Sequence, residues 1–197
     1  MKQALLVAML VFCVAGVATA QIGLKSIGGG VGYIGASFEG VDANGNPTTE
    51  TLGGFAIGVG ANLGELTPGL YLMPEIGYWT TSKDFGQDVS WSLSNFAING
   101  NVHYRFPSGA VTPYVGGGLG INFVSSTVKV PTVTIPGFGT FGGETKGSET
   151  RLGINLLGGA SYALNPSMSI GGQFRYVIAS DFNHFMILAT FSHALGM

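Results

Sequence analysis

The sequence predicts an all-β protein, an eight-stranded antiparallel up-and-down transmembrane β-barrel, and three observations support this fold class. Long segments alternate apolar residues with polar or small ones at period two, which is the spacing of the two faces of a strand. The connections between these segments alternate in length. Charged residues make up only 9% of the chain against 46% hydrophobic residues, whereas soluble domains carry about 25% charged residues. A water-facing surface is hard to build from so few charges.

The amino-terminal residues 1–20 have the pattern of a secretory signal peptide. Lys2 precedes an uncharged apolar run over residues 4–18, and small residues end this run before the expected cleavage site between Ala20 and Gln21. A transmembrane anchor is the alternative, but a spanning helix needs roughly 20 apolar residues and this run is shorter. We therefore expect an exported chain from which the signal is removed.

Residues 21–197 are expected to form one barrel domain. The only cysteine, Cys13, lies in the signal, which excludes disulfides and thiolate catalysis from this domain. Without Lys2 the formal net charge is −3, from seven Lys and Arg against ten Asp and Glu, so the domain has no basic footprint for nucleic acid. No other apolar stretch approaches the length of a spanning helix, and a closed barrel is the other structure that satisfies the backbone across a bilayer. Export and a barrel together predict the cell outer membrane.

Eight candidate strands follow from the period-two pattern, and each reaches the roughly 9–11 residues that a tilted spanning strand requires. They cover residues 25–39, 51–64, 69–82, 89–106, 112–127, 149–164, 168–180 and 184–195. Along residues 168–180, Phe174, Tyr176 and Ile178 share one face, while Gln173 and Arg175 share the other. The first face suits lipid and the second suits a polar interior.

The connections give a second signal for the same architecture. Short turns rich in Pro, Gly, Asn or Ser occupy residues 65–68, 107–111 and 165–167, and they alternate with longer links over residues 40–50, 83–88 and 128–148. Short periplasmic turns and longer outer loops are typical of outer-membrane barrels. The last outer link, residues 181–183, is short and departs from this trend.

Glycine is abundant, with 34 residues, although glycine weakens a strand. Gly116, Gly118 and Gly120 fall on one face of the strand predicted over residues 112–127. In a small closed barrel, glycine on the inner face makes room for larger neighbours. The alternative, a flexible low-complexity chain, would not keep the apolar parity.

Two short motifs resemble a known family. The segment Arg105-Phe106-Pro107, followed by residues 112–120 (TPYVGGGLG), resembles the turn and fifth strand of OmpA-like eight-stranded outer-membrane barrels, and residues 72–78 (LMPEIGY) resemble the third strand with its inward acidic residue. The resemblance spans residues 21–197. It implies insertion by the outer-membrane assembly machinery and a role as an anchor, adhesin, narrow channel or structural protein. The chain ends in Met197, whereas this family's assembly signal usually ends in an aromatic residue, and no second domain is expected.

The inner parities predict a polar plug in the lumen. Its members are Glu75, Arg105, Arg175, Arg151, Asn99, Asn101 and Gln173, with Arg151 nearer the outer mouth. Glu75 and Arg175 fall at similar heights on strands that face each other across the barrel, and we expect them to pair because an unpaired charge in a filled interior costs several kcal/mol. A gate that opens when this pair breaks is the functional alternative. General diffusion of solutes is not expected, since eight strands enclose little more than their own side chains.

The histidines provide the only enzymatic alternative. His103 is expected on the inner face near the periplasmic end, His184 at the outer rim, and His193 near the carboxyl end. Ser180, Asp181 and His184 could form the Ser and His set of an outer-membrane lipid hydrolase. No nucleophile motif surrounds them, so we expect His184 to be an ordinary rim residue. The loop carboxylates are scattered, and neither a metal nor a cofactor is expected.

The link over residues 128–148 is the predicted contact surface. It is unusually apolar for a loop that meets only water, and exposed apolar surface often marks a contact site. Its candidate contact residues are Val130, Val133, Ile135, Phe138 and Phe141. The link either extends its two strands as a hairpin above the membrane or binds a partner, and we favour a hairpin with some recognition role.

The aromatic residues complete the expectations. Trp and Tyr favour membrane interfaces, and the interface candidates are Tyr33, Tyr78, Trp91, Tyr104, Tyr162 and Tyr176, whereas Trp79 has luminal parity. We expect a non-enzymatic, monomeric barrel in contact with outer-membrane lipids, with a structural or adhesin-like role and an extracellular surface partner. The rivals are a narrow pore for ions or small apolar solutes, a lipid hydrolase and a soluble secreted β-sandwich.

Overall fold

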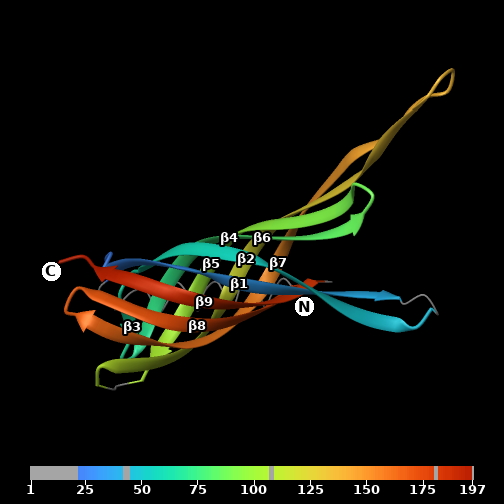
Figure 1. Cartoon of the computed structure of the whole chain (residues 1–197). Helices are drawn as coiled ribbons and strands as arrows, with labels where there is room; N and C mark the ends of the chain where they lie inside the picture. The colour runs from blue at the N-terminus through green and yellow to red at the C-terminus, as the bar shows by residue number, and fades with distance from the viewer. Residues whose placement is uncertain (1–21, 42–44, 107–108, 180–181, 197) are drawn as a thin grey trace, which may run out of the picture.

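The chain folds into a closed ring of antiparallel strands (Figure 1). The computed structural model describes residues 22–41, 45–106, 109–179 and 182–196, so the expected signal peptide and its cleavage site at Ala20 and Gln21 lie outside the described residues. The strands are β1 (Ser26–Val41), β2 (Pro47–Asn62), β3 (Glu65–Thr67), β4 (Leu70–Gly86), β5 (Val89–Arg105), β6 (Val111–Ile135), β7 (Gly139–Asn165), β8 (Met168–Ala179) and β9 (Phe182–Ala194). Each long strand pairs with its neighbours in sequence, and β1 pairs with β9, which closes the barrel.

The ring contains the eight spanning strands that the sequence predicts, and β3 is an addition to them. The segment expected to be a tight turn, residues 65–68, forms a three-residue strand that pairs only with the start of β4. Because β3 is so short, β2 pairs directly with β4 beyond it, from Gly54↔Thr81 to Gly60↔Glu75. The closed ring overturns the alternative of a soluble β-sandwich, which would need two packed sheets.

The outward face is a continuous apolar band, as the alternating pattern predicts. Its side chains are 41–55% exposed and include Val31, Phe55, Ile57, Ile76, Phe96, Ile98, Leu119, Ile121, Ile154, Leu156, Phe174, Ile178, Ile187 and Phe191. Soluble monomers rarely expose an apolar surface of this extent, and it suits the hydrocarbon of a bilayer. Four interface candidates, Tyr33, Tyr78, Tyr104 and Tyr162, lie on this face, each 40–47% exposed.

The two ends of the barrel differ. One end carries the start of β1, the end of β9, β3 and the turns, while at the other end paired strands run on as hairpins (Figure 1). Short turns mark the periplasmic end and long loops the extracellular end. The link expected over residues 83–88 is shorter than predicted, since only Gln87 and Asp88 separate β4 from β5, and both have positive φ (53° and 59°). Positive φ at both central residues defines the type I′ turn that suits a twisted hairpin.

The described residues contain no helix that is long and apolar enough to cross a membrane.

Candidate functional site

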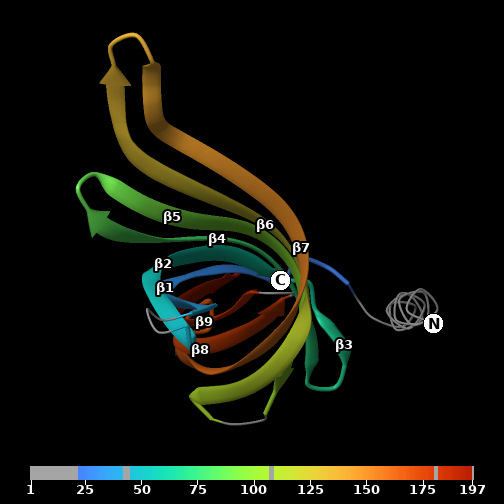
Figure 2. The same ribbon diagram turned by 90° about the vertical axis from the view of Figure 1, so that its right-hand side faces the viewer.

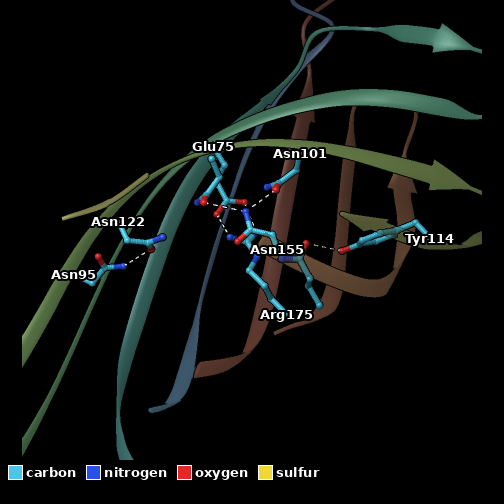
Figure 3. A network of polar contacts seen from close by, with 9 residues as sticks. Glu75, Asn95, Asn101, Tyr114, Asn122, Asn155 and Arg175 are labelled. Carbon is cyan, nitrogen blue, oxygen red and sulfur yellow. Dashed lines mark hydrogen bonds and ion pairs between the residues drawn. The ribbon is translucent and has the colours of Figure 1, made fainter. Parts of the chain in front are cut away.

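The lumen is organised in three layers along the barrel axis. A cavity occupies the periplasmic third, a polar network lies in the middle (Figure 3), and an apolar cluster fills the extracellular third. These layers follow the residue order along each inward face. On β4, for example, Met73 lines the cavity, Glu75 belongs to the network and Trp79 to the apolar cluster.

An ion pair between Glu75 and Arg175 crosses the barrel. Arg175 donates from Nη1 to Oε1 and from Nη2 to Oε2 of Glu75, both at 2.5 Å, in a two-pronged arrangement (Figure 3). The side chain of Arg175 is 2% exposed and that of Glu75 is 18% exposed. The two side chains come from β4 and β8, which lie on opposite sides of the ring. This is the pairing that strand order and parity predict.

Asparagine side chains form the rest of the polar network. Asn155 donates from Nδ2 to Oδ1 of Asn99 at 3.0 Å and to Oδ1 of Asn101 at 2.9 Å, and Asn95 donates to Oδ1 of Asn122 at 2.9 Å. All five are at most 5% exposed. The sequence points to Asn99 and Asn101, but not to Asn155, as a plug residue. Its parity on β7 carried that signal, since it is a polar residue between the lipid-facing Ile154 and Leu156.

Glycines on β6 make room for this network. A Cβ at Gly118 would lie 2.4 Å from Oδ1 of Asn101, and one at Gly120 would lie 2.3 Å from Oδ1 of Asn99. Real Cβ atoms do not approach so closely, so the asparagines occupy the space that side chains at these positions would need. The room-making role expected for the inner-face glycines is confirmed here.

The apolar cluster closes the extracellular third. Its buried members are Ile34, Ala36, Ala56, Trp79, Leu93, Val177, Ala179, Met186 and Leu188. Trp79 is luminal, as its parity predicts, and only 2% exposed. The prediction that Trp91 lies at the membrane interface is wrong, because Trp91 shares the inward parity of Leu93. It donates from Nε1 to Ser126 Oγ at 2.8 Å, and its ring contacts that of Phe38 edge-on at 5.0 Å between centroids.

His184 corrects a second expectation. It is not a rim residue, because its side chain is 2% exposed inside the barrel and its ring lies 5.2 Å from the ring of Trp79. Position 184 has the inward parity of Met186 and Leu188, and the apolar residues around it in the sequence hid that signal. Ser180 and Asp181, its proposed hydrolase partners, lie outside the described residues. A histidine buried in the lumen does not face lipid, which counts against that enzymatic reading.

The periplasmic third of the lumen is not filled by side chains. It holds a cavity of about 460 Å³, lined by residues that include Lys25, Glu75, His103 and Arg105. His103 lies on the inner face near the periplasmic end, as predicted, and stacks on Tyr114 at 5.0 Å with an angle of 4° between the rings. Tyr114 donates its hydroxyl to Oε1 of Gln173 at 3.2 Å.

The predicted plug residues therefore divide into separate groups. Glu75, Arg175, Asn99 and Asn101 belong to the middle layer, where Glu75 also borders the cavity, whereas Gln173 and Arg105 belong to the cavity lining alone. Arg151 joins neither group and pairs with Glu149 on its own strand near the extracellular mouth. Sequence parity correctly selects inward positions, but it does not show which of them touch.

Among the residues that the structure describes, no three His, Cys, Asp or Glu side chains lie close enough together to hold a metal ion.

The link over residues 128–148 is a hairpin that continues β6 and β7 beyond the barrel, and it rises farther than the other hairpins (Figure 2). β5 accompanies β6 only to Lys129, and β8 accompanies β7 only from Gly153. A bulge between Val130 and Val133 bends it. The hairpin form that we favoured for this link is confirmed.

The four described candidate contact side chains lie on this hairpin. Phe138 is 79% exposed, Phe141 and Val133 are each 54% exposed, and Val130 is 40% exposed, while the side chain of Ile135 lies outside the described part. Residues 130–143 carry no charge. We call the segment of residues 130–143 the apolar tip.

Charged residues lie directly below the apolar tip. Lys146 bonds to Glu144 at 2.7 Å, and Lys129 lies 3.6 Å from the same carboxylate. The hydrogen bond from Lys146 holds the pKa of Glu144 below its usual value of 4.5 and raises the pKa of Lys146. Two lysines thus share one carboxylate at the base of the apolar tip.

Known proteins share this architecture. Neisserial surface protein A superposes with a TM-score of 0.58 at 17% identity, over 86% of this chain and 96% of that one. Lower scores are found for the attachment invasion locus protein of Yersinia pestis (0.47, 11% identity, 87% and 99% covered) and for the N-terminal barrel of Pseudomonas aeruginosa OprF (0.44, 15%, 88% and 99%). At 17% identity, the likeness to Neisserial surface protein A concerns the fold alone.

No curated protein matches this chain. The model of one family, described as the outer membrane protein beta-barrel domain, matches residues 4–192, nearly the whole sequence. This match agrees with the closed ring, the apolar outward band and the polar interior. The chain therefore belongs to the outer membrane protein beta-barrel domain family and is a protein of the outer membrane.

Proposed function

We propose that this barrel is a non-enzymatic surface-contact protein that acts through the apolar tip of the β6–β7 hairpin. One observation carries the proposal: Val133, Phe138 and Phe141 are more than half exposed on a segment that stands clear of the barrel. Single exposed apolar residues are common on protein surfaces, but a grouped set marks a contact site. Large aromatic side chains are also the usual anchors of protein interfaces.

The hairpin is suited to such a contact because its backbone is already ordered. β6 and β7 pair with each other from Val111↔Tyr162 up to Ile135↔Gly139. Binding by a paired segment loses less conformational entropy than binding by a flexible loop. The partner belongs to the extracellular side, and an apolar surface on it would complement the uncharged tip.

The register defines a clean test. Lys129 and Glu144 face each other across the hairpin, so residues 130–143 can be replaced by a two-residue Asn-Gly turn that keeps the strand pairing below. We expect cells that carry this variant to lose adhesion to an immobilised host surface while the barrel still assembles. A full-length variant with Val133→Thr, Phe138→Ser and Phe141→Ser keeps the hairpin and should lose adhesion as well. Adhesion equal to that of the wild type in both variants would exclude the apolar tip as the contact site.

A narrow pore is the second candidate, favoured by the open periplasmic third of the lumen. Two closures stand in series above that cavity: the Glu75–Arg175 pair, and the apolar cluster that contains Ile34, Trp79 and Leu93. Breaking the first closure leaves the second in place. We therefore expect no steady conductance in planar bilayers for the wild type or for Glu75→Gln, and conductance that appears in Glu75→Gln would support a gate formed by the pair.

A further inference from the structure

We propose that the cavity at the periplasmic end of the barrel binds a small soluble organic anion, one that bears a phosphate or carboxylate group and is no larger than a sugar phosphate. This site lies at the opposite end of the molecule from the hairpin and is independent of the surface-contact function.

The cavity has the size and enclosure of a ligand site. Its volume is about 460 Å³, within the range of roughly 300–1,000 Å³ that is typical of small-molecule pockets. Bare backbone forms the wall on β1 and β2, where Gly28, Gly30, Gly58 and Gly60 line the cavity. The carboxylate of Glu75 lies at its inner end, below the apolar cluster. The cavity is therefore a blind vestibule rather than a passage.

The lining has an excess of positive charge. Glu75 is the only carboxylate among the described lining residues, and both of its oxygens are bound by Arg175. Lys25 and Arg105 line the same cavity and form no ion pair with any residue that the structure describes. Two cations without a counter-ion in a partly enclosed space attract anions.

Arg105 is held in place for a ligand. Its guanidinium lies over the ring of Tyr71, 4.5 Å from the centroid, and Nη2 lies 4.0 Å from Sδ of Met73. Neither contact uses the charge in an ion pair. A planar guanidinium that is fixed on one face presents a fork of N–H donors that matches the oxygens of carboxylate or phosphate groups.

His103 gives an independent indication of a missing partner. Its side chain is 6% exposed and lines the cavity, and Nε2 has no hydrogen-bond partner within the described residues. Most buried polar atoms in native proteins have a partner, and an orphaned one requires an explanation. A ligand oxygen bound between Arg105 and the stacked rings of His103 and Tyr114 would supply the partner after a small shift of the ring.

The chemistry of the remaining lining narrows the ligand class. Hydroxyl groups of Ser26, Thr112, Ser161 and Thr190 line the cavity, and they suit a body that carries hydroxyls of its own. A lipid headgroup could supply the same phosphate. However, Arg105 lies on the inward face, and the lipid-facing side of β5 at this height is occupied by Tyr104, which is 40% exposed. We therefore assign the site to a soluble anion.

The test uses the folded protein in nanodiscs, which leave both ends accessible, with glucose 6-phosphate as the probe. Calorimetric titration should give saturable binding, with glucose binding at least tenfold more weakly. Arg105→Gln should raise the Kd at least tenfold, while Arg151→Gln, the same change at the extracellular mouth, should leave it unchanged. Ser161→Leu fills the cavity without changing its charge and should also weaken binding. A heat-dependent gel shift confirms that each variant is folded.

Three outcomes would overturn the proposal. The first is that glucose binds as tightly as glucose 6-phosphate. The second is that Arg105→Gln and Ser161→Leu, when folded, both bind the probe like the wild type. The third is that only a short-chain phosphatidic acid binds, which would assign the cation to a lipid headgroup. Loss of adhesion in the hairpin variants has no bearing on these results, so the two proposals fail or stand separately.

Discussion

Replacing Glu75 by Gln should destabilise the barrel strongly, because it leaves the Arg175 guanidinium buried without a counter-charge. Removal of one partner of a buried pair costs about 3–5 kcal/mol. Arg175 is only 2% exposed, but Glu75 is 18% exposed and lines the cavity, so some hydration of the freed cation is expected. These exposures place the expected loss of unfolding free energy near the lower limit, about 3 kcal/mol.

The assay is urea unfolding in lipid vesicles, followed by tryptophan fluorescence and by the heat-dependent gel shift. Arg175→Met should be destabilising by a similar amount, whereas the double variant should lose clearly less than the two single changes together, because apolar groups can replace a buried pair at little cost. The control is Lys83→Gln, which breaks the exposed Lys83–Glu50 pair and should change stability by no more than about 1 kcal/mol. A loss below about 1 kcal/mol for Glu75→Gln, or strict additivity in the double variant, would refute the reasoning.

The remaining predictions concern close packing, the hairpin and the barrel as a whole. Gly120→Val should cost about 1–3 kcal/mol in the same unfolding assay, because its Cβ would displace Asn99, whereas Gly100→Ala points into open space and should be near neutral; equal effects would contradict this account. Lys146→Gln should raise the pKa of Glu144 in a carboxyl NMR titration, since the hydrogen bond that lowers it is lost. A lowered pKa means that the pairing is complete above the usual value and is lost as pH falls through the folded value, and an unchanged titration midpoint would show that the bond does not form. The wild-type protein should migrate faster on a gel before boiling than after it, and a single heat-independent band would argue against a stable closed barrel.

The sequence alone shows which face of a strand each side chain occupies. Alternation at period two assigns each residue to one face of a strand, so the parity of Phe174 against Arg175 gave both the lipid band and the polar interior. Up-and-down connectivity then fixes which strands face each other, and this is why the partnership of Glu75 and Arg175 could be foreseen. The order of the elements and this one long-range contact therefore need no tertiary information.

Parity, however, assigns a side chain only to the inner or the outer face of the barrel. The closed barrel determines how far an inward side chain reaches and which residues it contacts. His184 and Trp91 have inward parity, but only the folded ring shows which side chains they pack against in the lumen. The separation of Arg105 from the Glu75–Arg175 pair depends on strand tilt and stagger, which no local pattern contains. The same applies to the periplasmic cavity, because it arises where the glycines of β1 and β2 contribute no side chains to the wall. The sequence by itself determined the barrel, its faces and its polar centre, and the tertiary structure decided where that interior is filled and where it remains open.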